Sequence, residues 1–145
     1  MAFQFPLATV LRFRESIERR EERALQRVQM EMARVSRQID ELNVAIAQAH
    51  STREQAMQQT MPAGHLHTMV WEAQAAVERR NSLLATLQTL DQQREKQMKI
   101  YQAAHRDRET LINLFNQQRS EYEQRQVRAQ QKYLDDIFVA RRQRN

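Results

Sequence analysis

The stretch Met61-Pro62-Ala63-Gly64-His65 decides the fold of this chain, because it holds the only glycine and one of the two prolines among 145 residues. Glycine permits left-handed backbone and proline removes a hydrogen-bond donor, so these two residue types usually interrupt helices. The sequence on either side is rich in Ala, Glu, Arg, Gln, Leu and Met, which favour helix. A chain with one internal break has one place to turn. We therefore predict an all-α fold, a long two-helix antiparallel coiled-coil hairpin with a longer C-terminal helix.

The break divides the chain unequally. We predict a single coiled-coil domain over residues 1–145, with a first helix over about 6–60, a turn over about 61–65 and a second helix over about 65–142. Pro6 suits the first position of a helix, where its missing N–H is not needed. Counting outward from Gly64, the first helix runs out opposite roughly residue 120, which leaves about 25 residues of the second helix unpaired. Those residues still carry large apolar side chains: Tyr122, Tyr133, Leu134, Ile137, Phe138 and Val139. We interpret them as a surface for another protein, with fraying and self-association as the alternatives.

Apolar residues recur in alternating steps of three and four, which is the heptad pattern of a coiled coil. In the first helix this stripe is Leu25, Val28, Met32, Val35, Ile39, Leu42, Ile46 and Ala49. Upstream we expect the phase of the stripe to slip, because Arg14 and Glu21 intrude and the face is formed there by Leu7, Val10, Leu11, Ile17 and Ala24. In the second helix the predicted stripe includes Leu66, Val70, Ala73, Val77, Leu84, Leu87, Leu90 or Asp91, Met98, Tyr101, His105, Ile112, Phe115, Tyr122, Ala129, Tyr133 and Ile137. The polar residues Arg80, Asp91, Arg94 and Arg108 also fall on its core positions. Polar residues on such stripes weaken pairing but fix its register.

The composition excludes several function classes. The chain has no cysteine, so a disulfide framework and thiolate chemistry are excluded. No segment reaches the ~20 apolar residues of a membrane span, and the N-terminus lacks the pattern of a signal peptide. The pair His65 and His67 offers too few ligands for a metal site, and the many carboxylates are interleaved with arginines as on a solvated helix face. We predict no catalytic residues, no cofactor and no metal, and hence no enzyme.

Both ends of the chain resemble a known family. The opening Phe3-Gln4-Phe5-Pro6-Leu7-Ala8-Thr9-Val10-Leu11-Arg12-Phe13-Arg14 resembles the F-x-F-x-L-x-x-V-L-x-x-R start of the flagellar export protein FliJ family. The ending Lys132-Tyr133-Leu134-Asp135-Asp136-Ile137, followed by Arg141-Arg142, resembles that family's acidic–apolar–basic C-terminus. Length, missing cysteines, the Gln- and Arg-rich body and the mid-chain bend agree over essentially the whole chain.

The resemblance implies a non-enzymatic component of the flagellar type III export apparatus, cytoplasmic and peripheral at the inner face of the cell membrane. In that family the coiled coil is similar to the central stalk of rotary ATPases, and its paired ends enter the pore of the hexameric export ATPase. Other surfaces contact the cytoplasmic domain of the export-gate membrane protein and export chaperones. We place the ATPase-ring-binding residues at the two ends of the chain: Leu7, Val10, Leu11, Phe13, Tyr133, Leu134, Ile137, Phe138, Arg141 and Arg142. From their position in the hairpin we place the gate-binding surface at Gln38, Leu42 and Trp71.

Two other function classes fit the same heptads. The net charge of +5 permits a basic coiled coil that binds nucleic acid or ribosomes, although the excess charge is concentrated at the C-terminus. A generic coiled-coil scaffold or chaperone is the other alternative. The heptads themselves are compatible with an intramolecular hairpin and with an extended dimer.

Overall fold

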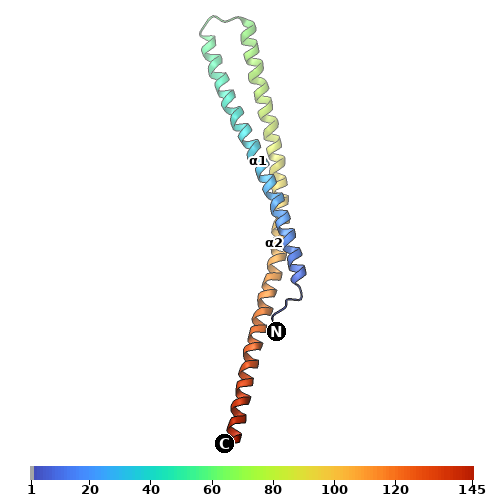
Figure 1. The fold of residues 1–145 in the computed structure, drawn as a ribbon. Helices are drawn as coiled ribbons and strands as arrows, with labels where there is room; N and C mark the ends of the chain where they lie inside the picture. The colour runs from blue at the N-terminus through green and yellow to red at the C-terminus, as the bar shows by residue number, and fades with distance from the viewer. Residues whose placement is uncertain (1) are drawn as a thin grey trace. The chain divides into compact units, whose positions relative to one another are not determined.

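The computed structural model describes residues 2–145, which form two long helices joined by a short connection. Helix α1 is Ala8–Met57 and helix α2 is Ala63–Arg144, so the predicted all-α two-helix hairpin with a longer second helix is confirmed (Figure 1). The chain divides into two compact units, and each unit contains part of both helices. The hairpin unit is Glu21–Ile100, and the terminal unit combines the chain up to Arg20 with Tyr101–Asn145.

The connection between the helices lies earlier than the sequence predicts. It occupies residues 58–62, and α2 already begins at Ala63. The carbonyl of Pro62 accepts bonds from the amides of His65 (3.1 Å) and Leu66 (3.4 Å), so Pro62 caps α2 and Gly64 lies in its first turn. No described glycine has a positive φ. The prediction that Gly64 supplies the bend is therefore wrong, and the predicted turn at 61–65 moves to 58–62.

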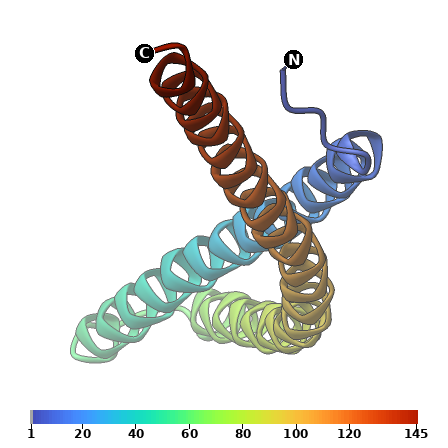
Figure 2. The ribbon, with the colours of Figure 1, turned by 90° about the horizontal axis from the view of Figure 1, so that it is seen from below.

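The start of α1 also differs from the prediction. The amide of Ala8 donates to the carbonyl of Phe5 at 3.1 Å, which makes a turn around Pro6 and Leu7 ahead of the helix. The first helix therefore begins two residues after Pro6. The irregular segment ahead of this turn, residues 2–5, leaves the start of α1 (Figure 2), and we call it the N-terminal strap.

Burial defines a continuous heptad seam along α1. Every third or fourth residue is buried or half-buried without a break: Leu7, Leu11, Arg14, Glu18, Glu21, Leu25, Val28, Met32, Val35, Ile39, Leu42, Ile46, Ala49, Arg53 and Ala56. The expected phase slip is therefore wrong, because the polar residues upstream of Leu25 keep the same spacing. Leu25, Val35 and Ile39 are the most deeply buried of the set.

Along α2 the seam agrees with the prediction in part. It runs through Leu66, Met69, Ala73, Ala76, Arg80, Leu83, Leu87, Leu90, Arg94, Gln97, Tyr101, Ala104, Arg108, Leu111, Phe115, Gln118 and Tyr122. Of the other predicted residues, Val77, Met98, His105 and Ile112 are half-buried beside this line. Val70 (39% exposed) and Leu84 (45% exposed) lie outside the seam, so these two predictions are wrong. The sequence offers apolar neighbours such as Met69/Val70 and Leu83/Leu84, so hydrophobicity alone permits both phases.

Polar seam residues pair across the helices. In the terminal unit the Glu18 carboxylate, with only 12% of its side chain exposed, accepts a hydrogen bond from Arg108 and lies 3.2 Å from Nδ1 of His105. Arg14 contacts Asp107 at 3.3 Å. In the hairpin unit Gln97 donates to the carboxylate of Glu21 at 2.7 Å. Such pairs are satisfied in one register only, so they fix the alignment of α1 with α2.

Candidate functional site

The free end of α2 is the most exposed apolar region of the terminal unit. The described ring contacts of the strap extend along α2 as far as Tyr122. Helix α2 continues through 22 further residues, 123–144. Within that stretch every residue except Ile137 is exposed. At 1.5 Å per residue it is about 33 Å long. Val127, Tyr133, Leu134, Phe138 and Val139 are between 53% and 69% exposed.

These apolar side chains point in several directions around the helix. With about 100° per residue, Val127, Leu134 and Phe138 fall within an arc of roughly 40°. Tyr133 and Ile137 lie roughly 100° to one side of that arc, and Val139 lies roughly 120° to the other. A single groove covers one face of a helix, whereas a socket that surrounds the helix can cover all three. The arrangement therefore suits an enclosing partner.

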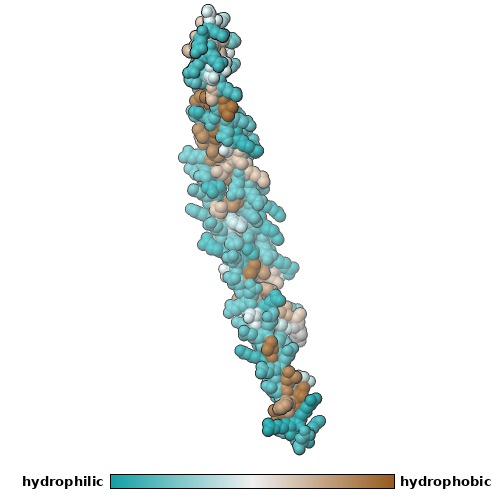
Figure 3. Space-filling model, turned by 90° about the vertical axis from the view of Figure 1, so that its left-hand side faces the viewer, coloured by the Kyte–Doolittle hydropathy of each residue, from teal (hydrophilic) through white to brown (hydrophobic). Residues whose placement is uncertain are grey.

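A hydrophilic, basic tip follows the apolar region. Arg141, Arg142 and Arg144 lie in the last turn of α2, where cations are favoured by the helix dipole. Figure 3 shows an apolar patch just before this hydrophilic tip, on a surface that is otherwise mostly hydrophilic. The free end thus presents exposed apolar side chains and then positive charge to whatever it contacts.

The N-terminal residues predicted for the ring site divide into two groups. Leu7 and Leu11 occupy seam positions, while Val10 (41% exposed) and Phe13 (61% exposed) point away from the seam. Because Arg14 pairs with Asp107, this part of α1 lies alongside α2 well before Tyr133. The structure therefore does not bring the N-terminal members of the predicted site next to the C-terminal members.

An aromatic cluster, which the sequence does not predict, ties the strap to α2. The ring of Phe5 meets Phe115 edge-on, with centroids 5.3 Å apart. The ring of Phe3 lies 5.6 Å from Phe115 and 5.5 Å from Tyr122. Phe5 is only 9% exposed and belongs to the small core of the protein. The sequence did hold a signal for this cluster. Phe3 and Phe5 lie near the N-terminus, and counting outward from the turn brings the region of Phe115 and Tyr122 opposite that end.

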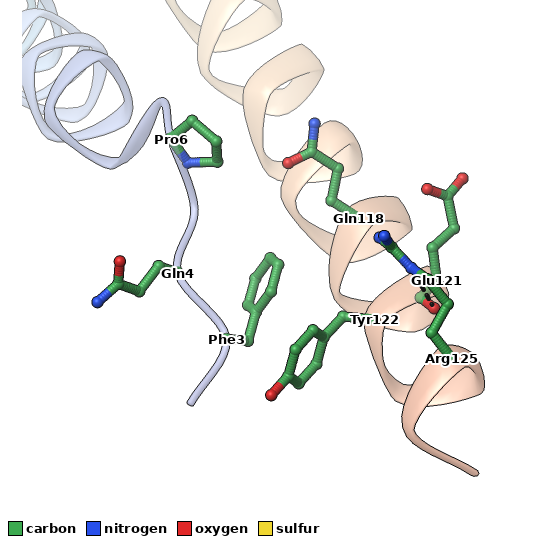
Figure 4. Close-up of a pocket in the computed structure, with 7 residues that line it drawn as sticks. All are labelled: Phe3, Gln4, Pro6, Gln118, Glu121, Tyr122 and Arg125. Atoms are coloured by element: carbon green, nitrogen blue, oxygen red, sulfur yellow. Dashed lines mark hydrogen bonds between the residues drawn. The ribbon is translucent and has the colours of Figure 1, made fainter. Parts of the chain in front are cut away.

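A cleft remains open beside this cluster. Its volume is about 390 Å³, and it lies between the strap and α2 (Figure 4). Phe3, Gln4 and Pro6 line one side, while Gln118, Glu121, Tyr122 and Arg125 line the other. In Figure 4 the rings of Phe3 and Tyr122 face each other across the gap, and Gln4 points away from α2. The strap therefore touches α2 through its rings and is not packed flush against it.

The predicted gate-binding residues lie in the hairpin unit, in two separate places. Gln38 and Leu42 line one groove together with Glu41, Ala45 and Arg79. Trp71 is 68% exposed and lies against its own helix, beside Gln74, Ala75 and Glu78. Both surfaces are accessible, but the groove does not include Trp71.

The described residues offer no metal site or membrane span. Residues 2–145 contain no group of three or more His, Asp or Glu side chains placed to hold a metal ion. His65 and His67 are both exposed at the start of α2. Over the same residues, neither helix has an apolar stretch long enough to cross a bilayer.

Comparison with known families places the chain. The family described as Flagellar FliJ protein matches residues 3–145, nearly the whole sequence. The chain belongs to the FliJ family. Membership of the FliJ family makes it a protein associated with flagellar export, and its helical structure agrees with the coiled coil expected of that family. No curated protein and no solved structure matched the chain significantly.

Proposed function

We propose that this FliJ family member is a stalk and adaptor that links the hexameric export ATPase to the export gate, without hydrolysing ATP itself. The free end of α2 enters the pore of the ATPase ring, with Tyr133, Leu134, Ile137 and Phe138 as apolar contacts. Arg141 and Arg142 lie beyond them. The observation that carries this proposal is the exposure of large apolar side chains on three sides of one unpaired helix. Burial of such side chains is a main source of binding free energy at interfaces.

The N-terminal part of α1 has a supporting role in this proposal. Leu7 and Leu11 hold α1 against α2, while the exposed Val10 and Phe13 are available to the rim of the ring. Because they lie alongside an earlier part of α2, they would meet the ring at a different depth from Tyr133 and Phe138.

The hairpin unit supplies the second contact of the adaptor. Gln38 and Leu42 in their groove, and the exposed Trp71, are the surfaces that we assign to the cytoplasmic domain of the export-gate protein. Exposed tryptophan is enriched at binding hot spots. This assignment places the protein at the cytoplasmic face of the cell membrane through its partners, where export chaperones could also reach it.

Deletion of residues 130–145 tests the ring contact. These residues are exposed apart from Ile137, so circular dichroism should show the remaining helix intact. Binding to the export ATPase of the same organism, and any stimulation of its ATP hydrolysis, should be lost. The double variant Leu134→Ser/Phe138→Ser should weaken binding at least about tenfold. The matched control Gln93→Ser/Gln102→Ser, on exposed polar positions of α2, should not. Normal binding and stimulation by the truncated chain would show that the free end is not the ring site.

Trp71→Ala tests the gate contact separately. Since Trp71 is largely exposed, the variant should keep its stability while binding of the gate protein's cytoplasmic domain falls. Gln88→Ala, at an exposed position of α2 away from the surroundings of Trp71, is the control. Equal binding by the two variants would remove Trp71 from the site.

A further inference from the structure

The N-terminal strap covers part of an apolar stripe that continues onto the free end of α2. Phe115, Tyr122, Tyr133 and Ile137 lie within an arc of roughly 60° on the helix, counting 100° per residue. Phe3 and Phe5 contact the first two of these residues. By contrast Tyr133, further along the stripe, is 66% exposed. One stripe is therefore covered at its proximal half and open at its distal half.

The strap is held in a way that permits release. It is not helical, and its described ring contacts with α2 are the three pairs among Phe3, Phe5, Phe115 and Tyr122. Each aromatic pair changes an equilibrium by roughly two- to tenfold. The cleft of about 390 Å³ beside the strap gives a second molecule access to the edge of the same rings. The turn at Pro6 and Leu7 separates the strap from α1, so the strap can move without unwinding the helix.

We infer that the strap is a displaceable latch over the proximal part of the ring-binding surface. The export ATPase, on binding the free end, displaces Phe3 and Phe5 and takes their place on Phe115 and Tyr122. The contact surface of α2 then begins at Phe115, about 12 Å before residue 123 along the helix. This inference rests on the proposed function, because it takes the ATPase ring as the partner of the free end. The apparent dissociation constant is then the intrinsic constant divided by the fraction of molecules in which the latch is open.

An engineered crosslink tests the latch in the full-length chain. The protein has no cysteine, so Gln4→Cys/Gln118→Cys introduces the only two thiols, one on each side of the cleft. A flexible bis-maleimide then ties the strap to α2. The same double variant treated with N-ethylmaleimide is the control, because it carries the same modifications without the tie. The opposite perturbation is Phe3→Ala/Phe5→Ala, which removes the ring contacts. Binding of each form to the purified export ATPase is measured by biolayer interferometry.

The latch predicts opposite shifts in the two arms. The crosslinked form should bind roughly tenfold more weakly than its control, and Phe3→Ala/Phe5→Ala should bind roughly tenfold more tightly than the wild type. Equal affinity of crosslinked and control forms would overturn the latch, and so would weaker binding by Phe3→Ala/Phe5→Ala, which would make the strap itself a contact. A chain lacking residues 130–145 separates the two proposals. If it binds normally, the proposed ring site fails; if it does not bind while crosslinking has no effect, only the latch fails.

Discussion

Replacing Gly64 by alanine should stabilise the protein and leave the hairpin closed. Gly64 lies in the first turn of α2, has no positive φ, and an added Cβ would meet no atom within 4 Å. Glycine in a helix is less stable than alanine by roughly 0.5–1 kcal/mol, largely because the unfolded chain loses more freedom. For a chain of this size that free energy corresponds to a melting temperature about 1–4 °C higher. Thermal unfolding followed by circular dichroism at 222 nm gives the shift.

Two measurements make this prediction sharp. Ala47→Gly, at an exposed position inside α1, is the matched reverse change and should lower stability by about 1 kcal/mol. Sedimentation should give the same molecular mass for Gly64→Ala and wild type, because the bend lies at residues 58–62. A less stable Gly64→Ala variant, or one that changes its mass, would show that glycine at this position is needed for the turn.

The remaining predictions concern the seam and its charges. Leu83→Ala should lower the free energy of unfolding by about 2 kcal/mol and Leu84→Ala by less than about 1 kcal/mol, because only Leu83 is in the seam; urea titration would reveal the opposite order if the seam had the other phase. Glu18→Ala should lower the free energy of unfolding by about 1–2 kcal/mol, because Arg108 and His105 lose their carboxylate partner in a partly buried layer. An unchanged free energy of unfolding in the same titration would mean that water satisfies Arg108 and His105 as well as the carboxylate does. Arg80→Leu should stabilise the hairpin by about 1 kcal/mol, because Nε of Arg80 is buried without a hydrogen-bond partner. A guanidinium unfolding midpoint lower than that of the wild type would contradict this prediction. Hydrogen bonding from Arg34 lowers the pKa of the Glu31 carboxyl. The stabilisation is thus present above the pKa of the unfolded state and is lost as pH falls through the lowered folded value. Melting curves of Glu31→Gln and wild type should differ slightly at neutral pH and converge in acid, and a difference that grows in acid would refute the pairing.

The sequence predicts the elements of this fold well because long helices leave a strong composition signal. Only two or three residues separate the predicted helix ends from Ala8, Met57, Ala63 and Arg144. The phase of the α2 seam could not be predicted in the same way. Where Leu83 stands beside Leu84, the choice depends on which side chain fits against α1, and that is a property of the pair of helices.

Polar seam residues explain the other errors. Arg14, Glu18 and Glu21 look like an interruption when apolarity alone is counted, but Asp107, Arg108 and Gln97 satisfy them from α2. The sequence predicts no contact for Phe3 and Phe5, because their partners lie more than a hundred residues away along the chain. The exposed apolar end of α2 was predictable, since it follows from the unequal lengths of the two helices.

The unbroken seams of α1 and α2 also restrict how such a chain can change its length in evolution. An insertion of one residue in either helix would rotate everything beyond it by about 100° and carry the seam out of its interface. Seven inserted residues in one helix would restore its face but misalign the charged pairs across the interface. The paired region can therefore lengthen or shorten only by whole heptads added to or removed from both helices together. The free end of α2 has no partner helix within the chain, so its length is not tied to the length of α1.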